Sequence, residues 1–287
     1  MNMFIVDLKK YIASSKFFIG IIIMVLLCLL ANAPLVSARD PLSVMDEIVR
    51  MRKDVWLDQG TQFCFENIWF NFDNSLWYVI VLPIIAAFPI VYTFSDEWFG
   101  DNYIMTLSRC GYGKYTFSKC ASAFATGFLT AACGIAVFGI ITAGVFPSLS
   151  DFGDGEELLY DHAYNSFWHS MLAKAVNHAL VCGIYACAAV LVCLILKDKF
   201  FTLSIFMVIN YFSKKLEIKY MLTKDMSVEK NRALRALFPS CQTSLHSVIP
   251  DNMHISFYWY ALFTAVFCTF IGVLSYFIIR RRYKYAA

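Results

Sequence analysis

Histidines beside acidic residues are the first candidates for chemistry in this sequence. His162 and His169 come just before an apolar segment, and His178 lies one to two turns inside it. Three acidic residues precede or flank the first histidine: Glu156, Glu157 and Asp161. Imidazoles and carboxylates are the usual nitrogen and oxygen ligands of zinc, and such groups within a membrane also relay protons. The pattern leaves a metal site open, but we favour the interpretation that His162 and His169 are polar residues at a membrane interface.

A second group of polar residues lies within that apolar segment. Lys174, Asn177 and His178 occupy neighbouring turns of the expected helix. Polar and ionisable groups within a span usually face the bundle interior or a cavity. We expect Lys174 to extend its ammonium group to the membrane surface. Asn177 and His178 are candidates for lining a transport pathway.

The commonest catalytic motifs are absent. The sequence has no G-x-x-x-x-G-K-[ST], so ATP binding by a P-loop is not expected and hydrolysis would need a partner. It also has no H-E-x-x-H, no G-x-S-x-G and no C-x-x-C pair. We therefore expect no enzyme activity and no metal site in this chain. Cys64 and Cys241 fall in expected outer loops, and whether they pair is open.

The composition places these residues in a bilayer. Of 287 residues, 59% are hydrophobic and only 16% are charged, which is too apolar for an ordinary soluble domain. The net charge is only +3, and the sequence has no long basic block interleaved with aromatic residues, so nucleic acid is not an expected partner. The lipid bilayer is the expected surrounding.

Apolar runs predict an all-α integral membrane protein with six transmembrane helices in a single domain, 1–287. A span needs roughly 20 mostly apolar residues. The expected spans are 17–33, 76–94, 120–146, 171–196, 200–213 and 255–279. The fifth is barely long enough, and the first is read as an uncleaved span despite its basic leader. Four glycines of the third span are expected to let helices approach closely: Gly127, Gly134, Gly139 and Gly144.

Basic residues in short flanks predict the orientation. Lys and Arg favour the cytoplasmic side, which puts both termini of a multi-pass cell-membrane protein in the cytoplasm. Segments 37–75, 147–168 and 214–252 are then non-cytoplasmic. The last of these is itself basic, which opposes the assignment, although the rule weakens for longer loops.

The segment from Ser95 to Lys119 is the only sizeable internal cytoplasmic loop in this layout. It mixes charges, glycines and aromatic residues between two apolar runs. Phe94, Trp98 and Met105 fall near one helical face, so we expect a helix lying along the membrane surface over about 95–110. Gly111 and Gly113 would end it before the third span.

Residues of this loop resemble the pattern of ABC-2 type permeases. The resemblance is carried by Glu97, Gly100, Leu107, Ser108, Arg109, Lys114, Tyr115 and Lys119. It implies a coupling helix that docks on a separate ATPase subunit, which would hold the ATP and Mg, with no cofactor in this chain. The implied coupling residues are Glu97, Trp98, Gly100, Arg109, Lys114 and Lys119. An interfacial aromatic belt with orienting basic residues is an alternative explanation of the same composition.

The resemblance implies the permease subunit of an ATP-binding cassette exporter. It would form half of a pathway with a second permease subunit, identical or related, for an amphipathic or lipid-like cargo such as a peptide, toxin or drug. Two alternatives remain open at this point: a membrane-embedded metal-dependent enzyme, and a non-transporting accessory or immunity protein.

Overall fold

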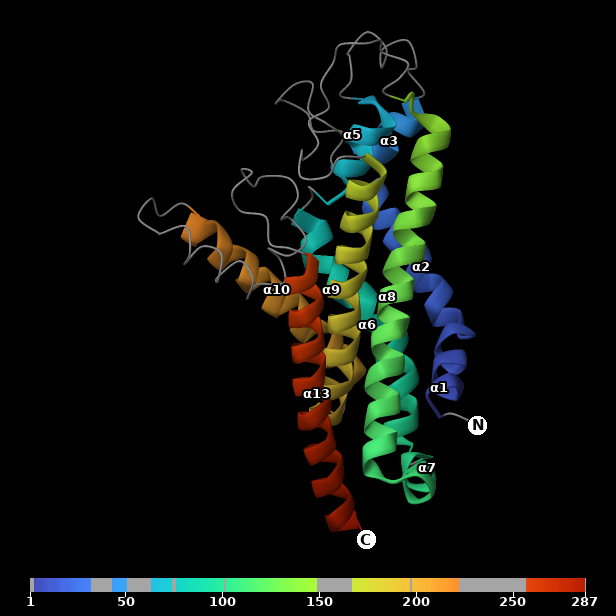
Figure 1. The fold of residues 1–287 in the computed structure, drawn as a ribbon, viewed down its shortest axis with the longest axis vertical. Helices are drawn as coiled ribbons and strands as arrows, with labels where there is room; N and C mark the ends of the chain where they lie inside the picture. Colours follow the sequence, from blue (N-terminus) through green and yellow to red (C-terminus); the bar gives the residue numbers. More distant parts are fainter. Residues whose placement is uncertain are drawn as a thin grey trace.

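The protein is a bundle of α-helices. The computed structural model describes residues 3–31, 43–50, 63–73, 76–100, 102–148, 167–196, 198–221 and 257–286, and no β-strand occurs among them. The helices are α1 (Met3–Ile12), α2 (Ser15–Leu29), α3 (Val44–Arg50), α5 (Phe65–Phe70), α6 (Leu76–Phe99), α7 (Asn102–Cys110), α8 (Tyr112–Val145), α9 (Phe167–Ile195), α10 (Lys199–Met221) and α13 (Phe257–Ala286) (Figure 1). The predicted all-α class is confirmed.

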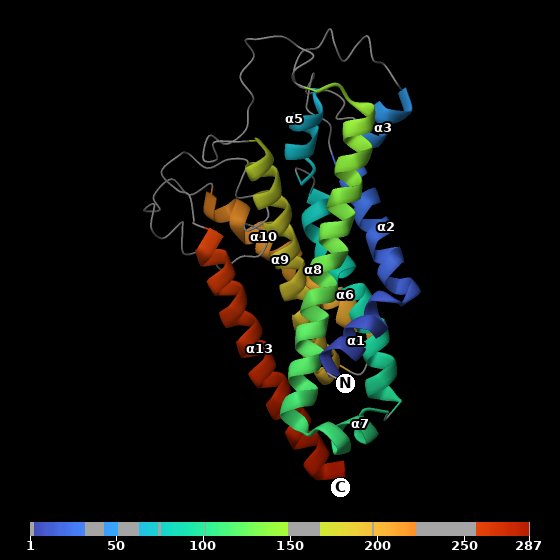
Figure 2. The same ribbon diagram turned by 45° about the vertical axis from the view of Figure 1, so that its right-hand side comes forward.

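Four helices within the described residues are long and apolar enough to cross a membrane. They contain the segments Ile80–Phe99, Tyr112–Val145, Met171–Ile195 and Thr264–Arg282. These correspond to the second, third, fourth and sixth predicted spans. Helix α9 packs against α6, α8 and α13, and lies at the centre of the bundle (Figures 1 and 2). This architecture is compatible with a membrane protein.

The first predicted span, 17–33, falls mainly on α2, which forms a bent pair with α1. Helices α1 and α2 meet at 58° across a break at Ala13 and Ser14. The Ser14 hydroxyl donates to the Tyr11 carbonyl oxygen at 2.6 Å within this break. Helix α2 has only 15 residues, about 22 Å at 1.5 Å per residue. Helix α2 alone is therefore shorter than a usual span, and the two helices reach the length of one span together.

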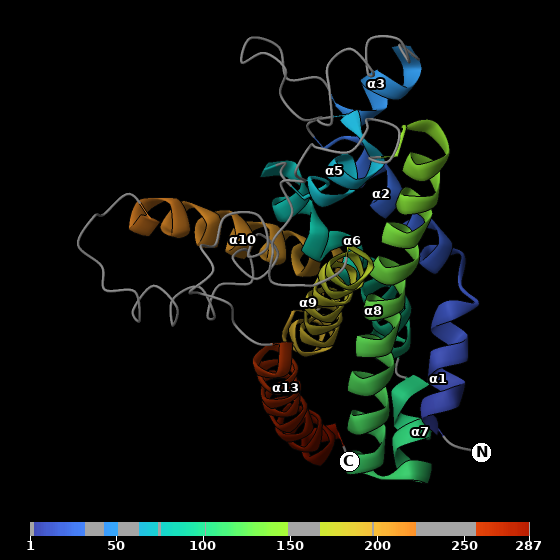
Figure 3. The ribbon, with the colours of Figure 1, turned by 45° about the horizontal axis from the view of Figure 1, so that its top comes forward.

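The fifth predicted span corresponds to a helix that is inclined to the others. The apolar part of α10, Lys199–Phe212, is shorter than the four long candidates. Figures 1 and 3 show α10 leaving the bundle at an angle. Thr202, Phe206 and Asn210 are buried on its inner face, whereas Phe201 and Phe212 are exposed.

Chain direction gives α10 a topological role. Helices α9 and α13 both run toward the end of the bundle where α7 lies (Figure 1). The chain must therefore return toward the opposite end between them. Helix α10 makes the described part of this return, and residues 222–256, which include most of the predicted outer segment 214–252, are outside the described residues.

Glycines set the distance between α8 and its neighbours. A Cβ atom at Gly127 would lie 2.7 Å from the backbone oxygen of Cys182 in α9, and one at Gly134 would lie 2.5 Å from the Met24 Cγ in α2. Both distances are shorter than van der Waals contact, so only glycine fits at this spacing. The predicted close approach is confirmed at these two positions.

The two glycines nearer the C-terminal end of α8 have different surroundings. Gly139 faces the Trp69 ring of α5, whose Nε1 would lie 3.1 Å from an added Cβ. No described atom lies within 4 Å of a Cβ placed at Gly144, so the close approach predicted there does not occur among the described residues.

Candidate functional site

The predicted surface helix is divided between two elements. Residues 95–99 continue α6, which ends at Phe99, and α7 then covers Asn102–Cys110. Gly100 lies in the turn between them, and Gly111, with φ of 75°, separates α7 from α8. A positive φ favours glycine because a side chain would clash with the backbone. Helix α7 thus forms a short crosspiece between two long helices at one end of the bundle (Figures 1 and 2).

Aromatic packing holds the inner face of α7. Tyr103 and Leu107 are buried, and the Tyr103 ring centroid lies 4.0 Å from that of Trp98 in α6. The guanidinium group of Arg282, from α13, lies 5.8 Å from the centroid of the Trp98 ring. Trp98, itself only 4% exposed, therefore connects α6, α7 and the end of α13.

The opposite face of α7 is open to the surroundings. Met105 is 71% exposed, and Ile104, Ser108 and Arg109 are also exposed. This face combines apolar and basic groups on a helix whose other side is anchored.

A buried charge cluster joins α1, α6 and α8 directly behind α7. The Lys119 side chain is 2% exposed, and its Nζ lies 2.7 Å from the Asp7 carboxylate and 2.8 Å from the Glu97 carboxylate. The Tyr115 hydroxyl donates to Glu97 at 3.1 Å, and Lys10 Nζ approaches the same carboxylate at 2.9 Å. The two buried carboxylates thus face the buried Lys119 ammonium and the half-exposed Lys10 ammonium, which offsets the cost of burying Asp7, Glu97 and Lys119. We call these five residues the Lys119 cluster.

The six coupling residues predicted from the sequence therefore have different environments. Arg109 and Lys114 are exposed, Gly100 lies in the turn before α7, and the remaining three are internal: Glu97, Trp98 and Lys119. The internal three cannot touch a docked partner in this conformation, but they fix the position of α7. Sequence reasoning missed Asp7, whose only signal is that it is the one acidic residue in the basic N-terminal segment.

A second buried charge cluster lies toward the opposite end of the bundle. Lys174 Nζ lies 2.7 Å from Asp73 Oδ1, and His178 Nε2 lies 3.4 Å from Asp73 Oδ2. The Tyr78 hydroxyl is 3.1 Å from His178 Nδ1, and the Phe72 ring packs against His178 with centroids 5.0 Å apart. These five residues, the Asp73 cluster, tie the turn before α6 to α9.

The ion pair decides the charge state of Asp73. Burial by itself raises the pKa of a carboxyl group, but the Lys174 ammonium and the His178 ring lower the pKa of Asp73 to about 2. The prediction that Lys174 extends to the membrane surface is wrong. Its side chain is 1% exposed, because the Asp73 carboxylate supplies a partner inside the bundle.

The two candidate pathway residues lie beside this cluster. Asn177 is 3% exposed and His178 is 0% exposed. Neither side chain faces an open passage in this conformation, so their role in a pathway stays a prediction.

No protein-family model matches this chain, and a search of curated proteins finds no similar sequence.

The remaining candidate sites are only partly described. No group of three His, Cys, Asp or Glu side chains able to hold a metal occurs among the described residues. His162 is outside them, as are about half of the predicted outer segment 37–75 and most of the predicted outer segment 147–168. Cys64 Sγ accepts a hydrogen bond from the Asn67 amide at 3.4 Å, and burial raises the pKa of the Cys64 thiol to about 12. Its suggested partner, Cys241, is outside the described residues, so the pairing is untested.

Proposed function

We propose that this chain is the membrane subunit of an ATP-driven exporter, with α7 as the helix that docks on a separate ATPase subunit. The observation that carries the proposal is the anchoring of α7. One face is held by Trp98 and buried aromatic contacts, whereas Met105 and Arg109 are exposed on the other. Docking requires an exposed face, and coupling requires that the helix be firmly attached to spans that can move.

The Lys119 cluster supplies that attachment. It joins α6, which precedes α7, to α8, which follows it, and adds α1 through Asp7. Separating the Lys119 ammonium from the two carboxylates would leave Lys119 and Asp7 buried without an oppositely charged partner, which is strongly unfavourable. A force applied to α7 would therefore move the ends of α6 and α8 together as a rigid body.

The rest of the proposed assembly follows from this role. A partner subunit would bind ATP and Mg, and a second permease subunit, identical or related, would complete a pathway across the cell membrane for an amphipathic cargo. The proposal requires six crossings, with α1 and α2 as the first and α10 within the fifth, and with both termini and α7 in the cytoplasm. Both termini lie toward the α7 end of the bundle (Figure 1), which supports this arrangement.

The experiment compares two charge reversals at the same end of the protein. Arg109→Glu changes the exposed face of α7, and Lys9→Glu makes the same change on the exposed face of α1. Tagged full-length protein is purified from its own cells in a mild detergent, and bound proteins are identified by mass spectrometry and assayed for ATP hydrolysis. We expect a P-loop ATPase to accompany the wild-type protein and the Lys9→Glu variant, but not the Arg109→Glu variant.

Two results would contradict the proposal. Recovery of no P-loop protein would favour an accessory or immunity function instead. Equal recovery from both variants would show that the ATPase binds elsewhere than α7. Glu97 is left unchanged in this design because it is buried in the Lys119 cluster, and its substitution would disturb the fold as well as the docking.

A further inference from the structure

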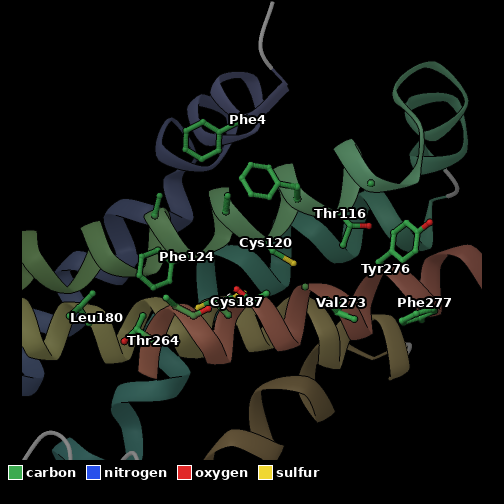
Figure 4. Close-up of a pocket in the computed structure, with 18 residues that line it drawn as sticks. Phe4, Thr116, Cys120, Phe124, Leu180, Cys187, Thr264, Val273, Tyr276 and Phe277 are labelled. Atoms are coloured by element: carbon green, nitrogen blue, oxygen red, sulfur yellow. Dashed lines mark hydrogen bonds between the residues drawn. The ribbon is translucent and has the colours of Figure 1, made fainter. Parts of the chain in front are cut away.

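An apolar groove runs between α8 and α13. Its volume is about 860 Å³, within the range of roughly 300–1,000 Å³ typical of ligand sites. Figure 4 shows Phe124, Thr116 and Cys120 from α8 on one wall, and Val273 and Tyr276 from α13 on the other. Nearly all of the lining is hydrocarbon, aromatic ring or thiol.

Basic residues continue the groove at one end. The lining positions of α13 include Gly272 and Val273, then Tyr276 and Phe277 one turn later. Because helix positions four apart share a face, the next turn places Arg280 and Arg281 on the same stripe. Both arginines are exposed. On α8, the exposed Lys114 directly follows Gly113, the first lining residue of that helix.

We propose that this groove binds an anionic phospholipid, with an acyl chain between α8 and α13 and the headgroup at Lys114, Arg280 and Arg281. The site has the two parts that such a molecule requires, a long apolar channel and a basic end at the level where the spans terminate. Exposed basic residues at the ends of spans attract anionic headgroups by about 1 kcal/mol each. The inference rests on membrane insertion of α8 and α13 and does not depend on ATPase coupling.

A second copy of this chain fits the groove less well. Two copies inserted in the same orientation would be related by a twofold axis along the membrane normal, so equivalent residues would meet at the same depth. Pairing through this face would bring two sets of Arg280, Arg281 and Lys114 together without acidic partners from the same stripe. An anionic lipid neutralises these charges, whereas a second copy doubles them.

The first test measures lipid binding to the purified full-length protein in detergent. Native mass spectrometry follows titration with dioleoyl phosphatidylglycerol and with dioleoyl phosphatidylcholine. Arg280→Gln together with Arg281→Gln should reduce the preference for phosphatidylglycerol about 30-fold, which corresponds to about 2 kcal/mol for two arginines. The single variants Arg280→Gln and Lys9→Gln are matched, because each removes one exposed basic residue at the same end of the bundle and Lys9 does not line the groove. Arg280→Gln should reduce the preference, and Lys9→Gln should keep it. Equal losses in these two single variants would overturn the headgroup assignment.

The second test fills the groove. No described atom lies within 4 Å of a Cβ placed at Gly272, and Gly272 lines the groove, so Gly272→Phe adds a ring to the groove wall at a position that has room for a side chain to begin. Gly144→Phe is the control, because Gly144 has the same open surroundings but does not line the groove. Gly272→Phe should remove binding of both lipids, and Gly144→Phe should not. Unchanged lipid binding in the Gly272→Phe variant would contradict the proposal. The same mass spectra report the oligomeric state, and if Gly272→Phe turned a dimer into a monomer while lipid binding persisted, the groove would be the contact between two copies and the proposal would fail.

Thiol labelling gives a measurement that needs no variant. Cys268 lines the groove, and the exposed Cys133 does not. Phosphatidylglycerol should slow the reaction of Cys268 with N-ethylmaleimide, read by mass spectrometry, relative to the reaction of Cys133. An unchanged ratio of the two rates at saturating phosphatidylglycerol would overturn the proposal.

Discussion

Lys119 Nζ lies 2.8 Å from the Glu97 carboxylate. In the chain, Glu97 precedes α7 and Lys119 follows it. Their ion pair closes the connection between α6 and α8 into a ring of contacts, with α7 as its outer side. Because the ion pair joins the two ends of this connection, α7 keeps its position relative to α6 and α8 when a force acts on it. This distinguishes it from an ordinary loop, which would absorb the displacement by changing its backbone angles.

Loss of the Lys119 ammonium should destabilise the protein strongly. Lys119→Met leaves the buried Asp7 carboxylate without its ammonium partner, while Glu97 keeps Lys10. Removal of one partner of a buried ion pair typically lowers the free energy of unfolding by about 3–5 kcal/mol. The measurement is the unfolding temperature of the purified protein in detergent, which we expect to fall by several degrees.

Two further variants control this result. Lys114→Met, five residues earlier on α8, removes an exposed charge and should change stability by less than about 0.5 kcal/mol. Asp7→Asn should restore part of the stability of Lys119→Met, because it removes the uncompensated charge. Similar unfolding temperatures for Lys119→Met and Lys114→Met would show that the Lys119 cluster contributes little.

The Asp73 cluster predicts a dependence of stability on pH. The pKa of Asp73 falls from its ordinary value of 3.8 to about 2 on folding. A carboxyl group with a lowered pKa in the folded state stabilises that state at every pH above its unfolded pKa. The contribution is lost as pH falls from about 4 to about 2. The wild-type protein should therefore unfold at a higher temperature than Asp73→Asn at pH 6, and the difference should narrow between pH 4 and pH 2.

The difference between the two proteins isolates this carboxyl group from all others that titrate in the same range. A difference that stays constant down to pH 2 would mean that Asp73 is not the ionised partner of Lys174.

The spacing of α8 against α9 predicts opposite effects for two identical substitutions. Gly127→Ala places a methyl group 2.4 Å from the Ala186 Cβ, which forces the helices apart and should cost about 1–3 kcal/mol. Gly144→Ala meets nothing and improves helix propensity, so it should be neutral or stabilising by up to about 1 kcal/mol. Thermal unfolding of both variants in detergent measures the contrast. Equal stability would show that α8 and α9 pack less closely at Gly127 than the geometry indicates.

Local patterns predicted the parts of this fold that local physics controls. Apolar runs identified the four long helices, and the glycines at positions 127 and 134 marked close packing before any neighbour was known. The predicted break is confirmed at Gly111, where the backbone has a positive φ that glycine tolerates. The break predicted at Gly113 is wrong, because α8 already begins at Tyr112.

Pairings between distant residues could not be predicted in the same way. Asp73 and Lys174 are 101 positions apart, and Asp7 and Lys119 are 112 apart. Hydrophobic periodicity relates residues within one helix, so it does not indicate which residues of distant helices form a pair. Lys174 was therefore assigned to the surface, where an unpaired ammonium group is least costly. The bend between α1 and α2 at Ala13 and Ser14 was not predicted, because it lies just before the predicted span 17–33, where basic residues indicate the flank of a span and not a helix that packs in the bundle.

Docking on an ATPase requires that α7 lie on the cytoplasmic side of the membrane. Helix α9 runs from Trp168 at one end of the bundle to the α7 end, so residues at these two ends should lie on opposite sides of the membrane (Figure 1). Met105 is 71% exposed and Trp168 is 67% exposed, which makes both suitable for labelling. In a Cys110→Ser background, Met105→Cys should react with a membrane-impermeant maleimide only after the cells are permeabilised. Trp168→Cys should react in intact cells. Labelling of Met105→Cys from outside would place α7 beyond the reach of a cytoplasmic ATPase, and labelling of both from one side would mean that α9 does not cross the bilayer.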